Sequence, residues 1–185
     1  MRQETASKFF IKNKESPYTG VLLEGEYFGE TKIDPQHPLY KEFEAKNYLK
    51  FKDALKLAKD SQIQDSLNPK ALFAKDLLIE VADKLIDAGL FKEDEREKIK
   101  FYSALNTPLD FLHGVDAFLD IDGVTITLDA TKNTQKGEHK ADFIIKEFLE
   151  PGIPEEEKEF FEKLENLAIQ IVNWYKEIKE TKAKK

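Results

Sequence analysis

The chain has 185 residues and a net charge of −7, with 41% hydrophobic and 35% charged residues. Its length predicts one domain, residues 1–185, with a hydrophobic core. Its acidic charge argues against a protein whose whole surface coats nucleic acid. The absence of cysteine excludes disulfides, zinc–thiolate sites and thiol nucleophiles, so metal ligands are expected among carboxylates and histidines. No run is long and apolar enough for a membrane span or a signal peptide, so we expect a cytoplasmic protein without a membrane partner.

The first half of the chain is predicted to be mainly helical. Residues 1–34 carry two strand-like segments bounded by glycine and proline, 8–12 and 20–28, which indicates an N-terminal arm or a small hairpin. Residues 39–59 place apolar side chains at three- and four-residue spacing, which predicts one helix. A second helix is expected to begin at Asn68 and Pro69, as N-cap and first-turn proline, and to end at Gly89.

The second half is predicted to combine strands with a long helix. Residues 93–104 are expected to form a third helix, and the short apolar segment 109–114 an additional strand. The polar residues 133–138 indicate a loop, and residues 141–148 a further strand antiparallel to its neighbour. A C-terminal helix is expected over residues 153–180, with acids in its first turn and lysines at its end, followed by a frayed tail at 181–185.

A β-hairpin is predicted between residues 114 and 132. Hydrophobic and polar residues alternate on both sides of Asp122 and Gly123, and alternation with period two predicts strands. An Asp-Gly pair favours the two-residue type I′ turn that joins antiparallel strands. With this turn, Ile121 pairs with Val124, and the register of the whole hairpin is defined.

The same register places Asp116 opposite Asp129. Their Cβ atoms are then expected about 4.5–5.5 Å apart, where like charges destabilise a hairpin unless a positive charge lies between them. A hard divalent cation supplies such a charge. The alternative is a pair on a solvated face, where water and salt screen the repulsion.

Residues 113–116 (HGVD) and 129–132 (DATK) resemble the metal site of the restriction-endonuclease-like, or PD-(D/E)XK, nucleases. The shared features are an acid on one strand of a hairpin, a second acid on the next strand and a lysine close behind it. The resemblance implies a nuclease-like core over residues 35–150, with Asp116 and Asp129 as ligands of Mg²⁺ or Mn²⁺. The implied reaction is hydrolysis of a phosphodiester bond in DNA or, less favoured, RNA.

The lysine of this family pattern is displaced by one position. The pattern has a lysine two residues after the second acid, whereas here Thr131 takes that place and Lys132 follows. In a regular strand Lys132 points to the opposite face. Either a bulge after Ala130 re-aims Lys132, or the role passes to Lys136 or Lys140, or no such site exists.

Three further residues are candidates for this site. The resemblance implies a glutamate from a helix ahead of the hairpin, and Glu80 is the preferred third metal ligand because apolar residues flank it. Glu44 on the preceding helix is its rival, and either is otherwise a boundary carboxylate that reaches solvent. His113 is interpreted as a packing residue, with water positioning or phosphate contact as the alternative.

One predicted helix carries an unusual density of lysines. A local basic patch is compatible with the acidic net charge, although a row of lysines is more often a solvated helix face. Both interpretations stay open for this set, which comprises Lys46, Lys50, Lys52, Lys56 and Lys59.

Together these patterns predict an α+β or α/β fold. A small mixed sheet is built around the hairpin of residues 115–130 and flanked by several helices, including the long C-terminal one. The Val/Leu/Ile face of the hairpin is expected to pack on the helix over 72–85 or on the C-terminal helix. The function implied is that of a metal-dependent endonuclease. The alternatives are a catalytically silent protein-interaction module, favoured by the displaced lysine and the acidic charge, and a Ca²⁺-stabilised structural module.

Overall fold

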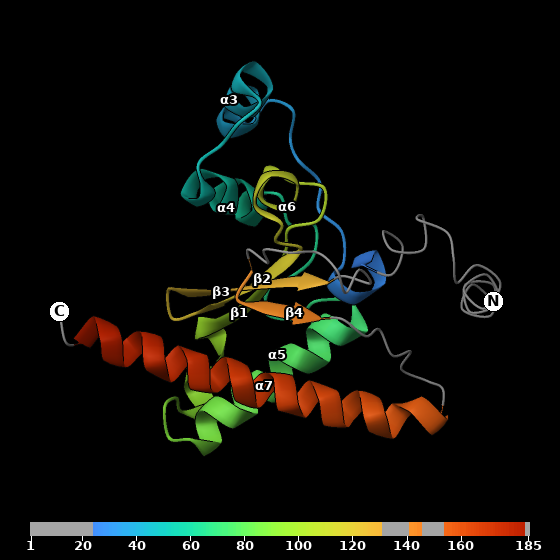
Figure 1. Cartoon of the computed structure of the whole chain (residues 1–185), viewed down its shortest axis with the longest axis vertical. Coiled ribbons are helices and arrows are strands. Elements are labelled where there is room, and N and C mark those ends of the chain that lie inside the picture. Colours follow the sequence, from blue (N-terminus) through green and yellow to red (C-terminus); the bar gives the residue numbers. More distant parts are fainter. Residues whose placement is uncertain (1–23, 131–140, 146–153, 184–185) are drawn as a thin grey trace.

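Within the described residues, four strands form one mixed sheet (Figure 1). The computed structural model describes three stretches of the chain: residues 24–130, 141–145 and 154–183. The order of the strands in the sheet is also their order in the chain: β1 (Ile99–Ser103), β2 (Ala117–Ile121), β3 (Val124–Ala130) and β4 (Phe143–Ile145). The first three strands form an antiparallel meander, and β4 pairs with β3 in parallel. The predicted fold class, a small mixed sheet around a hairpin, is therefore confirmed.

Helices cover both faces of this sheet (Figure 1). One face packs on α5 (Leu72–Asp87) and α7 (Pro154–Ala183), and the other on α4 (Phe51–Asp60) and α6 (Pro108–His113). The short α3 (Pro38–Lys46) lies beyond α4, farther from the sheet. In the part of the chain that the structure describes, no helix has the length and apolar character needed to cross a membrane.

The hairpin has the predicted register. Ile121 pairs with Val124 and Ala117 pairs with Leu128. The two turn residues, Asp122 and Gly123, have φ values of 49° and 78°. Positive φ at both central positions is what a type I′ turn requires. The Asp-Gly dipeptide therefore sets which side chains share a face of the sheet.

Both faces of the hairpin are buried. Leu119 and Ile126 lie on the face that packs on α5 and α7, so the predicted packing of the apolar face is confirmed for both helices. Phe118 lies on the other face and belongs to a second core with Leu57 of α4 and Leu109 of α6. The face that carries the hairpin acids is thus covered by helices.

Lys59 links α4 to the sheet face that carries Phe118. Its ammonium group pairs with the carboxylate of Asp120 on β2. It also lies 5.3 Å from the ring centroid of Tyr102 and 5.9 Å from that of Phe118, and these two rings stack with their centroids 5.0 Å apart. Cation–π attraction therefore supplements the ion pair.

The single helix predicted over residues 39–59 is wrong, because the structure has two helices there. α3 ends at Asn47, which adopts the left-handed conformation with φ 50°, and its N–H donates to the carbonyl of Phe43. Asparagine tolerates this conformation better than most residues. The break lets Leu49 turn into the second core, where it is 2% exposed.

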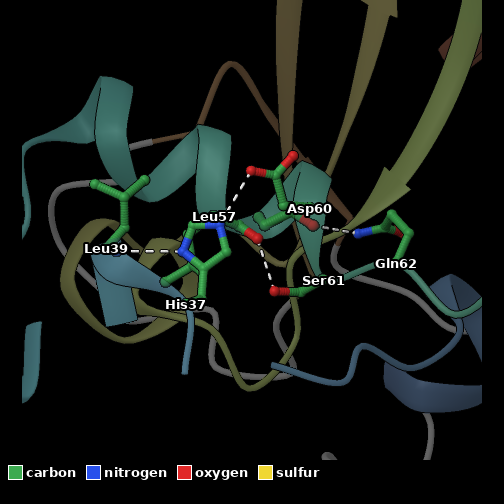
Figure 2. A network of polar contacts seen from close by, with 7 residues as sticks. His37, Leu39, Leu57, Asp60, Ser61 and Gln62 are labelled. Carbon is green, nitrogen blue, oxygen red and sulfur yellow. Dashed lines mark hydrogen bonds and ion pairs between the residues drawn. The ribbon is translucent and has the colours of Figure 1, made fainter. Parts of the chain in front are cut away.

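His37 joins the two helices (Figure 2). Its Nδ1 accepts a hydrogen bond from the N–H of Leu39 and so caps α3, while its Nε2 lies 3.2 Å from Oδ2 of Asp60 at the end of α4. Because Nδ1 is an acceptor, Nε2 carries the proton and donates to Asp60. Just beyond α4, the hydroxyl of Ser61 donates to the carbonyl of Leu57.

The helix predicted from Asn68 begins three residues later than expected and ends as predicted. Asn68 forms an isolated β-bridge with Asp65, so α5 starts at Leu72. At the other end Gly89 has φ 68°, and its N–H donates to the carbonyl of Ile86. Glycine at this position ends a helix because it adopts positive φ without a steric penalty.

The predicted helix over 93–104 and the predicted strand over 109–114 are both wrong. Residues 93–98 form the 3₁₀ helix η1 (Glu93–Lys98), and β1 follows because Ile99 and Phe101 alternate with polar neighbours and pair with β2. In α6, Thr107 caps the first turn, Pro108 stands at its start and Gly114 closes it at φ 61°. These capping residues outweigh the strand-like apolar pattern.

Two other predictions need correction. β4 runs parallel to β3, whereas an antiparallel partner was expected. Residues 24–28 are helical, so the strand expected over 20–28 is wrong for that part. The C-terminal helix is confirmed and continues to Ala183. The strand predicted at 8–12 and the loop predicted at 133–138 lie outside the described residues.

The turn geometry predicts a difference between two glycines. Gly123→Ala should lower the free energy of unfolding by about 1–2 kcal/mol, because its φ of 78° disfavours a Cβ atom. Gly25 has no such φ, and no atom lies within 4 Å of the position that an added methyl group would take, so Gly25→Ala should be neutral or stabilising by up to about 1 kcal/mol. Urea unfolding of the two variants checks this. Equal effects would contradict the type I′ turn.

Candidate metal centre

Asp116 and Asp129 lie at the open end of the hairpin, on the face covered by α4 and α6. The backbone ladder ends at Ala117 and Leu128, one pair before the two acids. Beyond it, the N–H of Asp116 donates to the carbonyl of Leu128 over 2.9 Å. The carboxylate Oδ2 of Asp116 then accepts the N–H of Ala130 over 2.7 Å. The carboxylate of Asp116 thus accepts a hydrogen bond that a backbone carbonyl would accept in a regular ladder, and this bond holds it against β3.

Both acids are buried. Asp116 is 6% exposed and Asp129 is 7% exposed. The alternative of a pair on a solvated face is therefore wrong. Burying carboxylates is costly unless they are neutralised, hydrogen-bonded or paired with a cation.

Burial raises the pKa of Asp116 to about 8. Loss of solvation is the main cause, and the N–H of Ala130 opposes it by stabilising the charged form. The negative charge of Asp129 raises the pKa further, and Glu24 and Asp110 add to this effect. At pH 7 Asp116 is therefore mostly protonated, so the pair carries fewer than two negative charges.

The donor set suits a hard cation better than zinc. Among the described residues, no group of three or more His, Cys, Asp or Glu side chains is arranged to hold a metal ion. Mg²⁺ needs no such group, since it commonly keeps several waters and is bound through one or two carboxylates. Two buried carboxylates that repel each other therefore fit Mg²⁺ or Mn²⁺, which can bind through two carboxylates alone.

Glu80, predicted as a third ligand, does not lie at this site. It belongs to α5, which packs on the opposite face of the sheet, and its carboxylate pairs with Lys84 over 3.4 Å. Lys84 also bridges to Glu165 of α7 over 2.6 Å. Glu80 therefore helps to join α5 to α7, which is the physical reason for a charge beside apolar residues. Its rival Glu44 is exposed on α3.

The remaining predicted candidates have different outcomes. His113 acts in packing, because its Nε2 lies 3.0 Å from the carbonyl oxygen of Leu49 and its ring meets that of Phe51 edge-on. The lysine role stays a prediction, because its three candidates lie outside the described residues: Lys132, Lys136 and Lys140.

Sequence reasoning missed Asp142, an acid that links the start of β4 to β3. Asp142 precedes β4, and its Oδ2 accepts hydrogen bonds from both the N–H and the hydroxyl of Thr127. Thr127 and Asp129 are two residues apart on β3 and share a face. Asp142 therefore fixes the start of β4 beside the acid pair. Only its position before a short apolar segment could have indicated this role.

Asp116→Asn should change how stability depends on pH. In the parent, the folded state keeps the Asp116 proton between pH 3.8 and about 8 while the unfolded state loses it, so this group makes stability fall as pH rises through that window. The cost is about 1.4 kcal/mol for each pH unit. The asparagine variant has no such ionisation, so its stability relative to the parent should increase from pH 5 to pH 8. Thermal melts of both proteins at the two pH values measure this difference. A constant difference would contradict the raised pKa.

Comparisons with known proteins add no relative to these observations. No protein-family model, no curated protein and no solved structure matches the chain. The function proposed below therefore rests on the geometry of Asp116 and Asp129 and on the sheet that carries them.

Proposed function

We propose that the protein is a metal-dependent nuclease in which Asp116 and Asp129 hold Mg²⁺ or Mn²⁺. The observation that carries the proposal is the burial of two carboxylates, one just before β2 and one on β3, that lie close enough for the charge of Asp129 to raise the pKa of Asp116. Two features support it further. The acids lie on a hairpin within a mixed sheet, as the resemblance to the PD-(D/E)XK nucleases implies, and their oxygens are the ligands that hard cations prefer. A cytoplasmic location is part of the same proposal.

A bound cation relieves the conflict within the acid pair. Without it, one carboxyl group must keep a proton to avoid two adjacent buried charges. Asp116 would release that proton when the two carboxylates hold a cation, so binding would strengthen as the pH approaches the pKa of Asp116. The N–H of Ala130 favours the charged form of Asp116 and so helps to prepare it as a ligand.

Each residue has a distinct part in the proposed reaction. Asp116, oriented by Ala130, and Asp129, fixed within β3, bind the cation. The cation supplies Lewis-acid stabilisation of the scissile phosphate and lowers the pKa of a water molecule. A lysine positions that water or stabilises the developing charge. Lys132, which follows β3 by two residues, is the first candidate for this part, before Lys136 and Lys140.

A protein-interaction module is the second candidate function. It is favoured because the described residues supply only two facing carboxylates, without the third ligand that the resemblance implies. The long helix α7 also exposes large apolar side chains, among them Phe161, Ile169 and Trp174. Exposed apolar side chains of this size are candidates for contacts with a partner.

A cleavage assay separates the two functions. With millimolar Mn²⁺ the purified protein should cut labelled DNA or RNA and stop when EDTA is added. Asp129→Asn should lower the rate by about 100-fold or more, because losing a ligand costs at least as much as losing a group that orients one. The matched control Asp94→Asn, an exposed acid on η1, should keep the parent rate.

The pH profile of the same assay tests the role of Asp116. The rate should rise about tenfold per pH unit below about pH 8, since the metal-free pair must lose its proton before it binds the cation. Failure to cleave duplex, single-stranded and structured substrates at high protein concentration would overturn the nuclease function and leave the interaction module.

A further inference from the structure

We propose that the outer side of α4 and the residues just before it bind single-stranded nucleic acid. This α4 surface consists of Tyr48, Lys50, Phe51, Lys52 and Lys56. The proposal rests on the nuclease function proposed above and deepens it, because it specifies the form of the substrate and the surface that receives it. Binding to this surface needs no metal ion, so it is tested separately from cleavage.

The structure divides the lysines of this region into two groups. Lys46 pairs with Glu42 over 2.8 Å, and Lys59 pairs with Asp120 below the helix. The other three are exposed and form no ion pair with a described residue: Lys50, Lys52 and Lys56. Three unpaired ammonium groups on a chain of net charge −7 form a local concentration of positive charge, as phosphate binding requires.

Two exposed aromatic rings belong to the same segment as these lysines. Tyr48 is 55% exposed and Phe51 is 43% exposed. The ring of Phe51 is held by an edge-on contact with His113, with the ring centroids 5.4 Å apart, and His113 is in turn fixed by the carbonyl of Leu49. Phe51 is therefore rigidly placed although nearly half of it faces solvent, as a base-stacking platform requires.

Both acids of α4 lie farther around the helix from Phe51 than its two exposed lysines do: Asp53, and Asp60, whose carboxylate pairs with His37. Successive residues of an α-helix are about 100° apart around its axis, so Lys52 and Lys56 lie one turn apart on a single stripe. Asp53 lies about 200° around the helix from Phe51, on the other flank. A strand whose bases stack on Phe51 therefore meets Lys52 and Lys56 before it reaches that carboxylate.

The aromatic rings select an unpaired strand. Bases in a duplex stack on one another and offer their faces to no side chain, whereas unpaired bases stack on exposed aromatic rings. The α4 surface also lies on the correct side of the molecule, because α4 and α6 cover the sheet face that carries the acid pair (Figure 1). Asp110 of α6 is close enough to Asp116 to influence its charge. A bound strand thus lies on the same side as the acids.

Fluorescence anisotropy in EDTA tests the proposal without any cleavage. The probes are a labelled oligothymidylate of about 15 nucleotides, long enough for one binding groove, and a labelled duplex of equal length. The single strand should bind more tightly than the duplex. Tyr48→Ser and Phe51→Ser should each weaken binding about 5- to 100-fold. The double variant Lys52→Gln/Lys56→Gln should lower the slope of log K against log salt by about 1.4.

Matched controls on the other side of the sheet are Trp174→Ser and Lys158→Gln, which change an exposed ring and an exposed lysine of α7. Both should bind as the parent does. Tyr48 lies outside both hydrophobic cores, so its variant stays informative if Phe51→Ser unfolds. Equal losses in the α7 variants, tighter duplex binding or no binding by the parent would overturn the proposal. If these binding tests fail but the protein cleaves nucleic acid with Mn²⁺, the nuclease function stands and the α4 binding surface is wrong. If the protein binds the single strand but does not cleave it, the α4 binding surface stands and the nuclease function is wrong.

Discussion

The burial of Asp116 beside Asp129 is the constraint on which the site and its surroundings depend. Two carboxylates out of water repel one another and lose their hydration, and the raised pKa of Asp116 is the direct consequence. At about 1.4 kcal/mol for each unit of pKa, full ionisation of this pair costs several kcal/mol. That is a large part of the roughly 5–15 kcal/mol that stabilises a folded domain. Protonation of Asp116 avoids this cost at pH 7, and the cation that we propose would offset it when both groups are ionised.

The two helical layers make this arrangement possible. One face of the hairpin packs on α5 and α7 in the larger core, which fixes the strands. The other face is covered by α4 and α6, which form the second core with Phe118. Lys59 ties α4 to the sheet through Asp120 and the stacked rings of Tyr102 and Phe118. The same helix exposes Lys52 and Lys56 to solvent, so one element both packs on the sheet and offers a charged outer surface.

The sequence predicted correctly the features that depend on the backbone conformation of a few neighbouring residues, namely the hairpin turn and the end of α5. The Asp122-Gly123 turn sets the register from Ile121–Val124 to Ala117–Leu128, one pair short of Asp116 and Asp129, and Gly89 marks the end of α5. β1 was mistaken for a helix because its five residues are too few to distinguish the two periods. The break at Asn47 was missed because the apolar spacing continues across it. In both cases pairing or burial elsewhere in the fold overrides the local pattern.

Tertiary arrangement accounts for the errors at the site. The sequence places Glu80 among apolar residues, but only the packing of α5 against α7 shows that its partner is Lys84. Likewise, alternation assigns Asp116 and Asp129 to one face without indicating that helices cover it. The parallel direction of β4, and with it the hydrogen bonds of Asp142 to Thr127, depends on how the chain crosses the sheet. No local pattern encodes that crossing.

A crystal structure of the protein soaked in Mn²⁺ tests most directly whether Asp116 and Asp129 hold a cation. The soak is done at a pH above 8, where Asp116 is ionised. Anomalous scattering at the manganese edge locates the ion independently of the refined atoms. If the pair holds the ion, a peak should appear within coordination distance of carboxylate oxygens from both Asp116 and Asp129. A map without a peak at this pair, or with manganese bound only elsewhere, would contradict the proposed site.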